Sequence, residues 1–196
     1  MITIIDYGTG NLQSVMNAFI RLGAEYELTA DPKKIRAAEK VLLPGVGAAR
    51  PAMDKLRSAG LTDTVKSLTQ PVLGICLGMQ LMCAWSEEGD TECLGIFDNT
   101  VRRFEVPGLK VPHMGWNNIY DLRTPLYKSA GENSYVYFVH SYAVEVNENT
   151  IASCDYGGAF SASLNKGNFF GAQFHPEKSG EVGEKILRNF LNLSEL

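Results

Sequence analysis

The first half of the chain alternates between short apolar runs and segments whose apolar residues recur at helical spacing. Runs such as 2–7 (ITIIDY) and 71–76 (PVLGIC) are almost wholly apolar, which is typical of strands buried on both faces of a parallel sheet. The pattern predicts strands at 2–7, 24–29, 40–45 and 71–76, and helices at 11–22, from Asp31–Pro32 onward, at 49–59 and at 77–85. This alternation predicts a right-handed parallel α/β unit.

The pattern changes between about residue 94 and residue 174, where strand-like runs follow one another without helices. Glycine- and asparagine-containing turns separate these runs, which are 134–144, 150–156, 160–165 and 168–175. They predict an antiparallel or mixed extension of the sheet, and residues 181–193 predict a closing helix. Without repeats or linkers, the chain is expected to be one α/β domain over residues 1–196, an open, mostly parallel sheet flanked by helices.

Composition narrows the class of protein. The 196 residues, 45% hydrophobic and 20% charged, are typical of a soluble globular protein. A net charge of −4 gives no sign of nucleic-acid binding, and no apolar run approaches the roughly eighteen residues that span a membrane. The N-terminal MITIIDYGTG lacks the basic region of a secretion signal. The four cysteines (Cys76, Cys83, Cys93 and Cys154) show no metal-binding spacing, so a reduced, cytoplasmic protein without a metal is expected.

Cys76 lies at the junction between a predicted strand and a predicted helix, between Gly74 and Gly78. This arrangement is the thiol counterpart of the Gly-x-Ser-x-Gly nucleophile elbow, in which glycines allow strand and helix backbones to approach closely. The helix N-terminus favours the thiolate, and the Leu77 amide can donate to an oxyanion formed on an attacked carbonyl. The alternative interpretation is a buried cysteine at a strand end, since free cysteine is among the most buried residue types.

A candidate base for this nucleophile lies in the sequence FHPEKS (174–179). His175 and Glu177 are two residues apart, and Pro176 is expected to keep the backbone extended, so that both side chains project from one face. A carboxylate in that position can orient an imidazole and stabilise its protonated form, which would complete a Cys-His-Glu triad. A surface turn would also explain the motif taken alone. The other two histidines, His113 and His140, are interpreted as packing or hydrogen-bonding residues.

A glycine-rich loop, LLPGVGAA (42–49), includes the end of the third predicted strand. Gly45 and Gly47 expose backbone amides there and tolerate unusual torsion angles. Taken alone, the loop would be an ordinary strand-to-helix turn. Together with the elbow and the His-Pro-Glu sequence, it is interpreted as a second oxyanion or substrate loop.

In this order and spacing, PGVGA, GICLGMQ and FHPEKS resemble the triad-type (class I) glutamine amidotransferases, and the resemblance covers essentially the whole chain. It implies an open, mostly parallel α/β sheet and hydrolysis of the side-chain amide of L-glutamine, with no cofactor. Cys76 would form a glutamyl thioester, His175 would transfer the protons, and Glu177 would align the imidazole. The amides of Val46 and Leu77 would receive the oxyanion.

The same resemblance carries over a set of substrate-binding residues, which are Gly45, Gly47, Gln80, Glu88, Ser141 and Tyr142. Gln80 lies one helical turn beyond Cys76, which would place both side chains on one face, whereas the Glu88 carboxylate could simply be solvated. Two further stretches, 6–15 (DYGTGNLQSV) and 110–119 (KVPHMGWNNI), resemble one branch of the family, the glutaminase subunits of a synthase of histidine biosynthesis.

That branch implies a partner, a (β/α)8-barrel cyclase subunit that would use the ammonia and form a heterodimer with this chain. The chain is expected to lack the synthase domain itself, and no nucleic-acid or membrane partner is expected. The residues expected at the interface are Asn11, Trp116, Asn117 and Lys178, on the face that carries the triad. Simpler interpretations stay open for three of them: a helix N-cap for Asn11, a core aromatic for Trp116 and a turn for Asn117.

Two alternative functions remain at this point. The glutaminase subunit of pyridoxal 5′-phosphate synthase would share the triad but should carry a different glycine-rich loop in place of PGVGA. A catalytically silent binding module could keep the same fold, although the intact Cys76, His175 and Glu177 argue against it.

Overall fold

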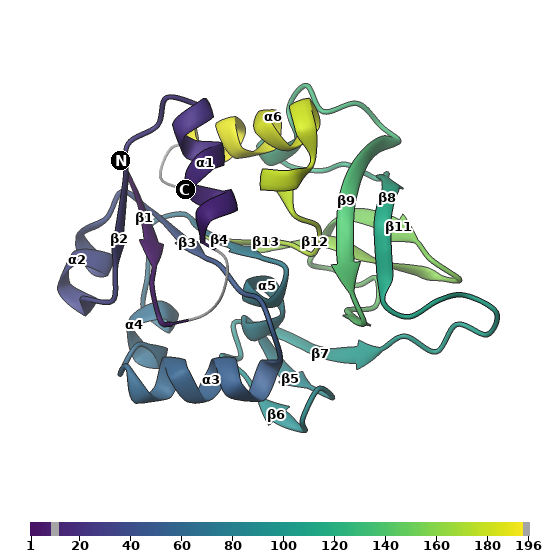
Figure 1. The fold of residues 1–196 in the computed structure, drawn as a ribbon, viewed down its shortest axis with the longest axis horizontal. Coiled ribbons are helices and arrows are strands. Elements are labelled where there is room, and N and C mark those ends of the chain that lie inside the picture. The colour runs from purple at the N-terminus through teal and green to yellow at the C-terminus, as the bar shows by residue number, and fades with distance from the viewer. Residues whose placement is uncertain (9–11, 194–196) are drawn as a thin grey trace.

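A seven-stranded sheet runs through the centre of the computed structural model, which describes residues 1–8 and 12–193 (Figure 1). Its strands, in spatial order, are β11 (Thr150–Asp155), β12 (Ala159–Lys166), β13 (Phe169–Ala172), β4 (Val72–Ile75), β3 (Lys40–Leu43), β1 (Ile2–Ile5) and β2 (Tyr26–Thr29). The strands from β13 to β2 are parallel, and β11 and β12 continue the sheet in antiparallel pairing. The predicted parallel unit and its antiparallel extension are therefore confirmed.

Helices cover both faces of this sheet, so that β1, β4 and β13 are buried along their whole length. One face is covered by α1 (Gln13–Arg21) and α6 (Gly180–Leu191), and the other by α2 (Pro32–Ala37), α3 (Ala49–Ser58), α4 (Thr62–Lys66) and α5 (Leu77–Leu81). Each face has its own hydrophobic core, which explains why these strands read as continuous apolar runs. Among the described helices, none is long and apolar enough to cross a membrane.

Two smaller sheets hold the remaining strands. β10 (Tyr142–Ala143), β7 (Phe97–Arg103), β5 (Cys83–Ser86) and β6 (Thr91–Glu92) form one sheet, and β8 (His113–Ile119) pairs antiparallel with β9 (Ser134–His140) in the other. The predicted run 134–144 thus divides at Ser141. The carbonyl of this residue accepts a hydrogen bond from the Phe104 N–H at 3.0 Å, where the chain passes from one sheet into the other. Two short 3₁₀ turns, η1 (Pro125–Tyr127) and η2 (Pro176–Lys178), complete the elements.

The segment after the elbow differs from the prediction. The sequence predicts a helix over 77–85, but α5 ends at Leu81 and residues 83–86 form β5. The Met82 carbonyl accepts hydrogen bonds from the amides of Ile96 and Phe97, both at 2.9 Å, which ties this segment to the start of β7. Helical periodicity in an apolar stretch does not report such pairing, because the tertiary context overrides local preference.

Candidate active site

Cys76 occupies a sharp turn between β4 and α5. Its backbone has φ 53° and ψ −112°, a conformation that costs energy for any residue with a side chain. Close packing requires the neighbouring glycines: a Cβ on Gly74 would strike the Met82 side chain, and one on Gly78 would strike the Leu43 carbonyl. The geometry of the predicted elbow is therefore present, with the thiol at the carboxyl end of β4.

His175 and Glu177 form a buried pair beyond the end of β13. The His175 Nδ1 lies 2.7 Å from the Glu177 Oε1, and the His175 backbone N–H donates to the Tyr137 carbonyl of β9 at 2.9 Å. The expectation of an extended backbone here is wrong, because Pro176 begins the turn η2, which folds the carboxylate back onto the imidazole. Ser179 stabilises this turn by donating from its Oγ to the His175 carbonyl at 2.6 Å.

The pKa of His175 reflects two opposing influences. Burial alone would lower it, because an imidazolium is poorly solvated in the interior. Hydrogen bonds and charge interactions with Cys76 and Glu177 outweigh burial and raise the pKa from 6.5 to about 10. A protonated His175 is therefore favoured at neutral pH, and it lines the same cavity as Cys76.

A cavity of about 370 Å³ opens above Cys76 and His175. It brings together residues that the sequence analysis singled out in distant segments, namely Val46, Gly47, Leu77, Gln80, Glu88, Ser141, Tyr142 and Lys178. Gly45 lies apart from them and lines an adjoining space of about 20 Å³ beside Glu177. The loops after β3, β4 and β13 meet here, at the carboxyl edge where open α/β sheets bind ligands. Within the described ranges, no group of three or more His, Cys, Asp or Glu side chains could hold a metal ion.

The candidate oxyanion donors are the backbone amides of Val46 and Leu77. No hydrogen bond between described residues uses either N–H group. Leu77 is the first residue of α5, where helix amides have no partner within the helix. Val46 is 40% exposed and precedes Gly47, which has φ 95°, so the loop has the torsional freedom to redirect the Val46 amide.

The contacts of Gln80 and Glu88 show which of their atoms can face a ligand. The Gln80 Nε2 donates to the Tyr142 carbonyl at 3.0 Å and to the Gln173 Oε1 at 2.9 Å. Both of its protons are thus committed, and its Oε1 is left to accept a hydrogen bond from a ligand. Glu88 is more than a solvated carboxylate, because its Oε2 accepts from the Ala49 N–H at 2.9 Å at the N-terminus of α3.

Gln173 is a residue of this site that the sequence analysis missed. Its side chain is fully buried, and its Nε2 lies 3.8 Å from the Cys76 sulfur. The available signal was a polar side chain two residues before His175 in an apolar run, since alternate residues of an extended chain share a face. His140 also lines the cavity, although the sequence assigned it only a packing or hydrogen-bonding role.

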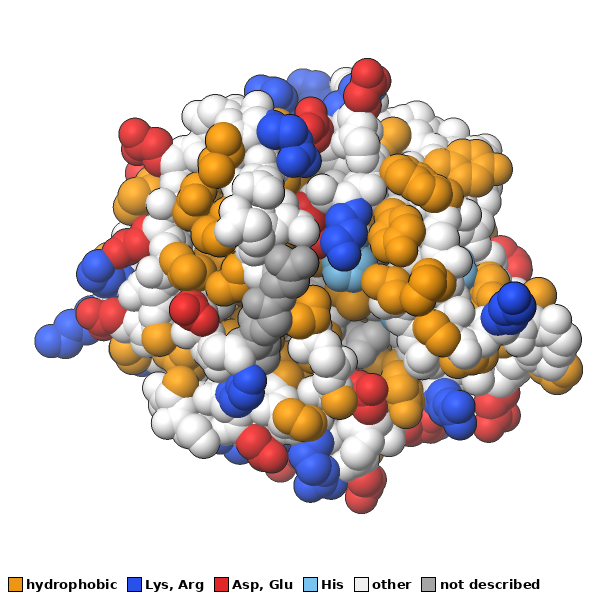
Figure 2. Space-filling view, viewed as in Figure 1, with side chains coloured by type: hydrophobic (Ala, Val, Ile, Leu, Met, Phe, Trp, Pro, Cys, Tyr) orange, Lys and Arg blue, Asp and Glu red, His pale blue; other side chains and the backbone are white. Residues whose placement is uncertain are grey.

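Exposed hydrophobic side chains gather over β8 and β9, beside a histidine surface and a basic side chain (Figure 2). The largest are Met114, Trp116 and Tyr135, with 62%, 56% and 61% of their surface exposed. The Trp116 ring meets the Tyr137 ring edge to face with 6.0 Å between centroids, and the Lys178 ammonium lies 6.0 Å from the centroid of the same Tyr137 ring. Trp116 is therefore a surface aromatic, and the core interpretation is wrong.

The two asparagines expected at the interface have different outcomes. Asn11 lies outside the described residues. Asn117 turns inward from β8: its Nδ2 lies 3.2 Å from the His113 Nε2 and donates to the Asp155 carbonyl at 2.9 Å, while its Oδ1 accepts from the Asn118 N–H at 2.8 Å. The turn interpretation is wrong, because both residues 117 and 118 belong to the strand. The amide of Asn117 is engaged within the chain.

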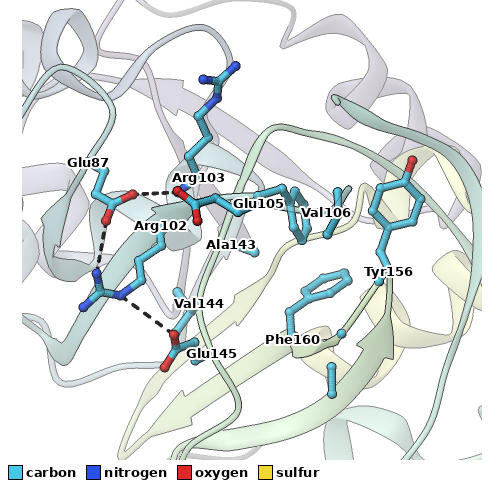
Figure 3. A pocket seen from close by; sticks show the side chains of 14 residues that line it. Glu87, Arg102, Arg103, Glu105, Val106, Ala143, Val144, Glu145, Tyr156 and Phe160 are labelled. Carbon is cyan, nitrogen blue, oxygen red and sulfur yellow. Dashed lines mark hydrogen bonds and ion pairs between the residues drawn. The ribbon is translucent and has the colours of Figure 1, made fainter. Parts of the chain in front are cut away.

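A second cavity, of about 350 Å³, shares strand β10 with the first (Figure 3). Tyr142 lines the first cavity, and the next residue of the strand lines the second. On one side of the second cavity, Arg102 pairs with Glu87 at 3.1 Å and with Glu145 at 3.9 Å. The rings of Tyr156 and Phe160 form the other side. None of the predicted catalytic residues lines this cavity.

Comparison with known proteins decides the family. The sequence profile described as "Glutamine amidotransferase class-I" matches residues 3–193. The chain belongs to the class-I glutamine amidotransferase family. Among solved structures, a glutamine amidotransferase shares the amidotransferase fold with a TM-score of 0.75 over 97% of both chains, at 18% sequence identity.

Curated relatives narrow the place of this amidotransferase within the family. The imidazole glycerol phosphate synthase subunit HisH of Bacteroides fragilis is 53% identical over 98% of this chain and 99% of its own. The HisH subunit of Shewanella loihica is 50% identical over 97% of this chain and 90% of its own. This amidotransferase is therefore of the HisH type, which agrees with the first interpretation and not with the pyridoxal 5′-phosphate synthase alternative.

Proposed function

We propose that this amidotransferase hydrolyses L-glutamine at Cys76 and passes the ammonia to a synthase partner. The observation that carries the proposal is His175, which contacts Glu177, has a raised pKa and lines the same cavity as Cys76. A thiolate, an imidazolium and uncommitted backbone amides in one cavity are what attack on an amide carbon requires.

The proposed reaction has two halves. In the first, the Cys76 sulfur attacks the side-chain carbonyl carbon of glutamine, and the amides of Val46 and Leu77 stabilise the oxyanion. His175 donates its proton to the departing nitrogen, so ammonia leaves and a glutamyl thioester remains. In the second half, His175 takes a proton from water, and the resulting hydroxide displaces the sulfur. Glutamic acid leaves and ionises, Cys76 returns to the thiolate, and Glu177 keeps the imidazole aligned throughout.

The proposed substrate site uses the walls of the same cavity. The Gln80 Oε1 accepts a hydrogen bond from glutamine, because both protons of its Nε2 are committed elsewhere. Glu88 suits the α-ammonium group by its charge. The remaining proposed contacts are Gly47, Ser141 and Tyr142, which line this cavity, and Gly45, which lines the adjoining space beside Glu177. A Gln80→Ala variant should therefore bind glutamine more weakly.

The proposed partner is a (β/α)8-barrel cyclase subunit in a heterodimer, and the reduced cytoplasm is the proposed location. The curated relatives are named as one subunit of a synthase, which implies a partner subunit. The exposed Trp116 and Met114, close to the cavity, are large apolar side chains of the kind that become buried in interfaces. The cyclase would combine ammonia with a phosphoribulosyl-formimino aminoimidazole carboxamide ribonucleotide, giving imidazole glycerol phosphate and an aminoimidazole carboxamide ribonucleotide.

A labelling and assay experiment tests this function. The chain is treated with a chloroketone analogue of glutamine, and ammonia release from glutamine is measured with and without the cyclase barrel and its ligand. We expect one label on Cys76, protection by excess glutamine, and ammonia production in the complex. Equal labelling of a Cys76→Ala variant, or a complex that releases no ammonia from glutamine, would overturn the proposal.

A further inference from the structure

Two buried histidines that the proposed reaction does not use face each other across the β8–β9 ladder. His113 and His140 are register partners in this ladder, and the His113 Nδ1 lies 3.0 Å from the His140 Nε2. Both side chains are almost fully buried, with 3% and 6% exposure. His140 lines the catalytic cavity, so the pair joins that cavity to the inner face of β8.

The hydrogen-bond partners at the two ends of this pair determine which ring nitrogens carry protons. The His140 Nδ1 is 2.8 Å from the Tyr142 carbonyl oxygen, which can only accept, so Nδ1 carries the proton. The Nε2 of a neutral His140 must then accept, and the His113 Nδ1 must donate to it. The His113 Nε2 is left as an acceptor, and the Asn117 Nδ2 faces it at 3.2 Å. One tautomer of each ring satisfies the whole chain of contacts.

The orientation of the Asn117 amide is fixed independently of the histidines. Its Nδ2 donates to the Asp155 carbonyl at 2.9 Å, and its Oδ1 accepts from the Asn118 N–H at 2.8 Å. Exchanging the nitrogen and oxygen of this amide would set oxygen against oxygen at Asp155. Asn117 therefore presents a donor to His113, as the tautomers require.

Aromatic side chains keep the pair neutral. His113 is stacked between the rings of Phe138 and Tyr156, with centroid distances of 4.8 Å and 4.0 Å. The Phe160 ring lies 5.3 Å from His140, and it forms one side of the second cavity together with Tyr156 (Figure 3). Burial lowers the pKa of His113 to about 4 and that of His140 to about 3. A further proton on the His113 Nε2 would also face the N–H of Asn117, so these rings are unsuited to acid–base catalysis.

The chain of contacts continues on the catalytic side of Tyr142. The Tyr142 carbonyl receives a second hydrogen bond, from the Gln80 Nε2 at 3.0 Å. The same Nε2 donates to the Gln173 Oε1 at 2.9 Å, and the Gln173 Nε2 lies 3.8 Å from the Cys76 sulfur. The Tyr142 carbonyl is thus shared between the histidine pair and the side chain proposed to receive glutamine.

We propose that His140, held by His113 and Asn117, is a positioning residue that fixes the Tyr142 carbonyl and, through it, the Gln80 side chain in the orientation that accepts glutamine. The inference rests on the proposed glutamine site. His140 acts through its Nδ1 proton and not through the bulk of its ring. His113 and Asn117 act by keeping that proton on Nδ1.

The first test is a ¹⁵N NMR measurement of the histidine tautomers in the unmodified chain at pH 7. We expect His113 and His140 to be neutral, each with its proton on Nδ1, whereas free histidine favours the Nε2 tautomer. His175 should give an imidazolium signal of its own, because its pKa is raised to about 10. An imidazolium signal assigned to His113 or His140, or a proton on the Nε2 of His140, would overturn the inference. This spectrum needs no variant and no bound glutamine, so it stands even if the proposed substrate site fails.

The second test compares two replacements of His140 that separate its donor from its bulk. Phenylalanine keeps the ring but removes the Nδ1 donor, whereas asparagine loses bulk but can place its Nδ2 where Nδ1 was. Glutamine affinity is measured by calorimetry in a Cys76→Ala background, where no turnover occurs. We expect His140→Phe to raise the dissociation constant about tenfold and His140→Asn to raise it about threefold or less.

The second test is decided by which of the two variants has the higher dissociation constant for glutamine. If His140→Asn binds more weakly than His140→Phe, ring bulk matters and the positioning inference is wrong. Failure of the Cys76→Ala parent to bind glutamine would instead count against the proposed glutamine site, and the NMR tautomers would still test the histidine pair. Thermal melting of each variant checks that the fold is kept.

Discussion

The Glu177 carboxylate reaches the His175 ring from only two residues away, with 2.7 Å between Oε1 and Nδ1. Because the turn η2 supplies this contact, one short segment assembles the acid–base pair. The carboxylate engages Nδ1, so Nε2 is the ring nitrogen left to face the Cys76 sulfur. The sulfur itself arrives from β4, whose parallel pairing with β13 brings Ile75 opposite Ala172 and so sets the two segments side by side.

Replacing Cys76 with alanine should abolish glutamine hydrolysis and leave the fold intact, because a small apolar residue fits the elbow. The proposed cyclase partner should still turn over when ammonium salt is supplied directly. Ammonia release, cyclase rate and circular dichroism measure these three properties. Cys83→Ala is the matched control, since Cys83 is buried in β5 away from the cavity and its variant should stay active. Glutamine-dependent turnover in the Cys76 variant would show that another group is the nucleophile.

Replacing Glu177 with glutamine should lower kcat about 10²- to 10⁴-fold, because the carboxylate aligns His175 and stabilises its protonated form. The pKa of His175 should fall, since Glu177 helps to raise it. If the rate depends on the imidazolium, it should fall as the pH rises through the pKa of His175. In the variant this fall should begin at a lower pH than in the unmodified protein. Glu181→Gln makes the same change at an exposed position in the first turn of α6 and should have no effect. Identical pH–rate profiles for the two variants would rule out the assigned role of Glu177.

Replacing Gly47 with alanine should lower glutaminase activity about 10²- to 10³-fold, which is the typical cost of losing one oxyanion donor. Its φ of 95° is strained for alanine, although no atom lies within 4 Å of the added Cβ. The effect would therefore come from a shift of the loop that carries the Val46 amide. Gly167→Ala is the control: that residue has φ 57° and equally open surroundings, in the turn between β12 and β13. Equal activity of both variants would remove the loop from the mechanism.

Replacing Trp116 with alanine should weaken binding of the proposed cyclase barrel by about 2 kcal/mol, or roughly thirtyfold in dissociation constant, as for a buried aromatic hot spot. Lys178→Ala should change the free energy of binding by about 1 kcal/mol or less. It should mainly disturb the coupling between the glutaminase site and the proposed cyclase site. Trp85→Ala is the control, because Trp85 is 38% exposed but belongs to β5. Calorimetric titration measures all three. A complex in which Trp116 stays in solvent would contradict the proposed interface.

The free energy of unfolding should fall as the pH drops from about 6.5 to about 4. The folded chain keeps His113 and His140 neutral, with pKa values of about 4 and 3, while unfolding returns both towards 6.5. The unfolded state thus binds more protons in this range, so stability rises with pH. At pH 5 the free energy of unfolding is lower by roughly 2 kcal/mol for each ring than at a pH where the rings are neutral in both states.

His175 has the opposite sign and does not mask this effect. Its raised pKa contributes stability that is present below pH 6.5 and is lost as the pH rises towards 10. Urea unfolding at pH 6.5 and pH 5.0 therefore isolates the buried pair, and His113→Phe should reduce the difference by about half. The same stability at both pH values would mean that the two rings are not held neutral.

Short-range signals in the sequence predicted the parallel sheet and the elbow. Asp31 before Pro32 marks the start of α2, and its carboxylate accepts a hydrogen bond from the Lys33 N–H at 2.8 Å. Gly74 and Gly78 indicated a close approach of backbones, which the packing against Met82 and Leu43 requires. Each of these features is decided by burial pattern, or by residues a few positions apart.

Contacts between distant segments account for what the sequence did not predict. Residues 83–86 have the hydrophobic periodicity of a helix, but they form the strand β5 because they pair with β7. The bond between Gln80 and Gln173 joins residues 93 positions apart, and the one between His113 and His140 spans 27. No local pattern in the sequence shows which buried polar side chains will contact one another. These contacts of the candidate site could therefore be found only in the structure.

Cys76 differs from the other three cysteines in its access to a cavity that a reagent can enter. Burial raises the pKa of Cys93 to about 11 and that of Cys154 to about 12, and the Cys83 thiol is raised further. These three thiols stay protonated at neutral pH. Of the four cysteines, all of them described in the structure, only Cys76 lines the cavity that His175 also lines. A mild alkylating reagent should therefore react once per folded chain. Its stoichiometry, read from intact mass, gives a titration of competent sites, so that preparations of different quality can be compared per active molecule.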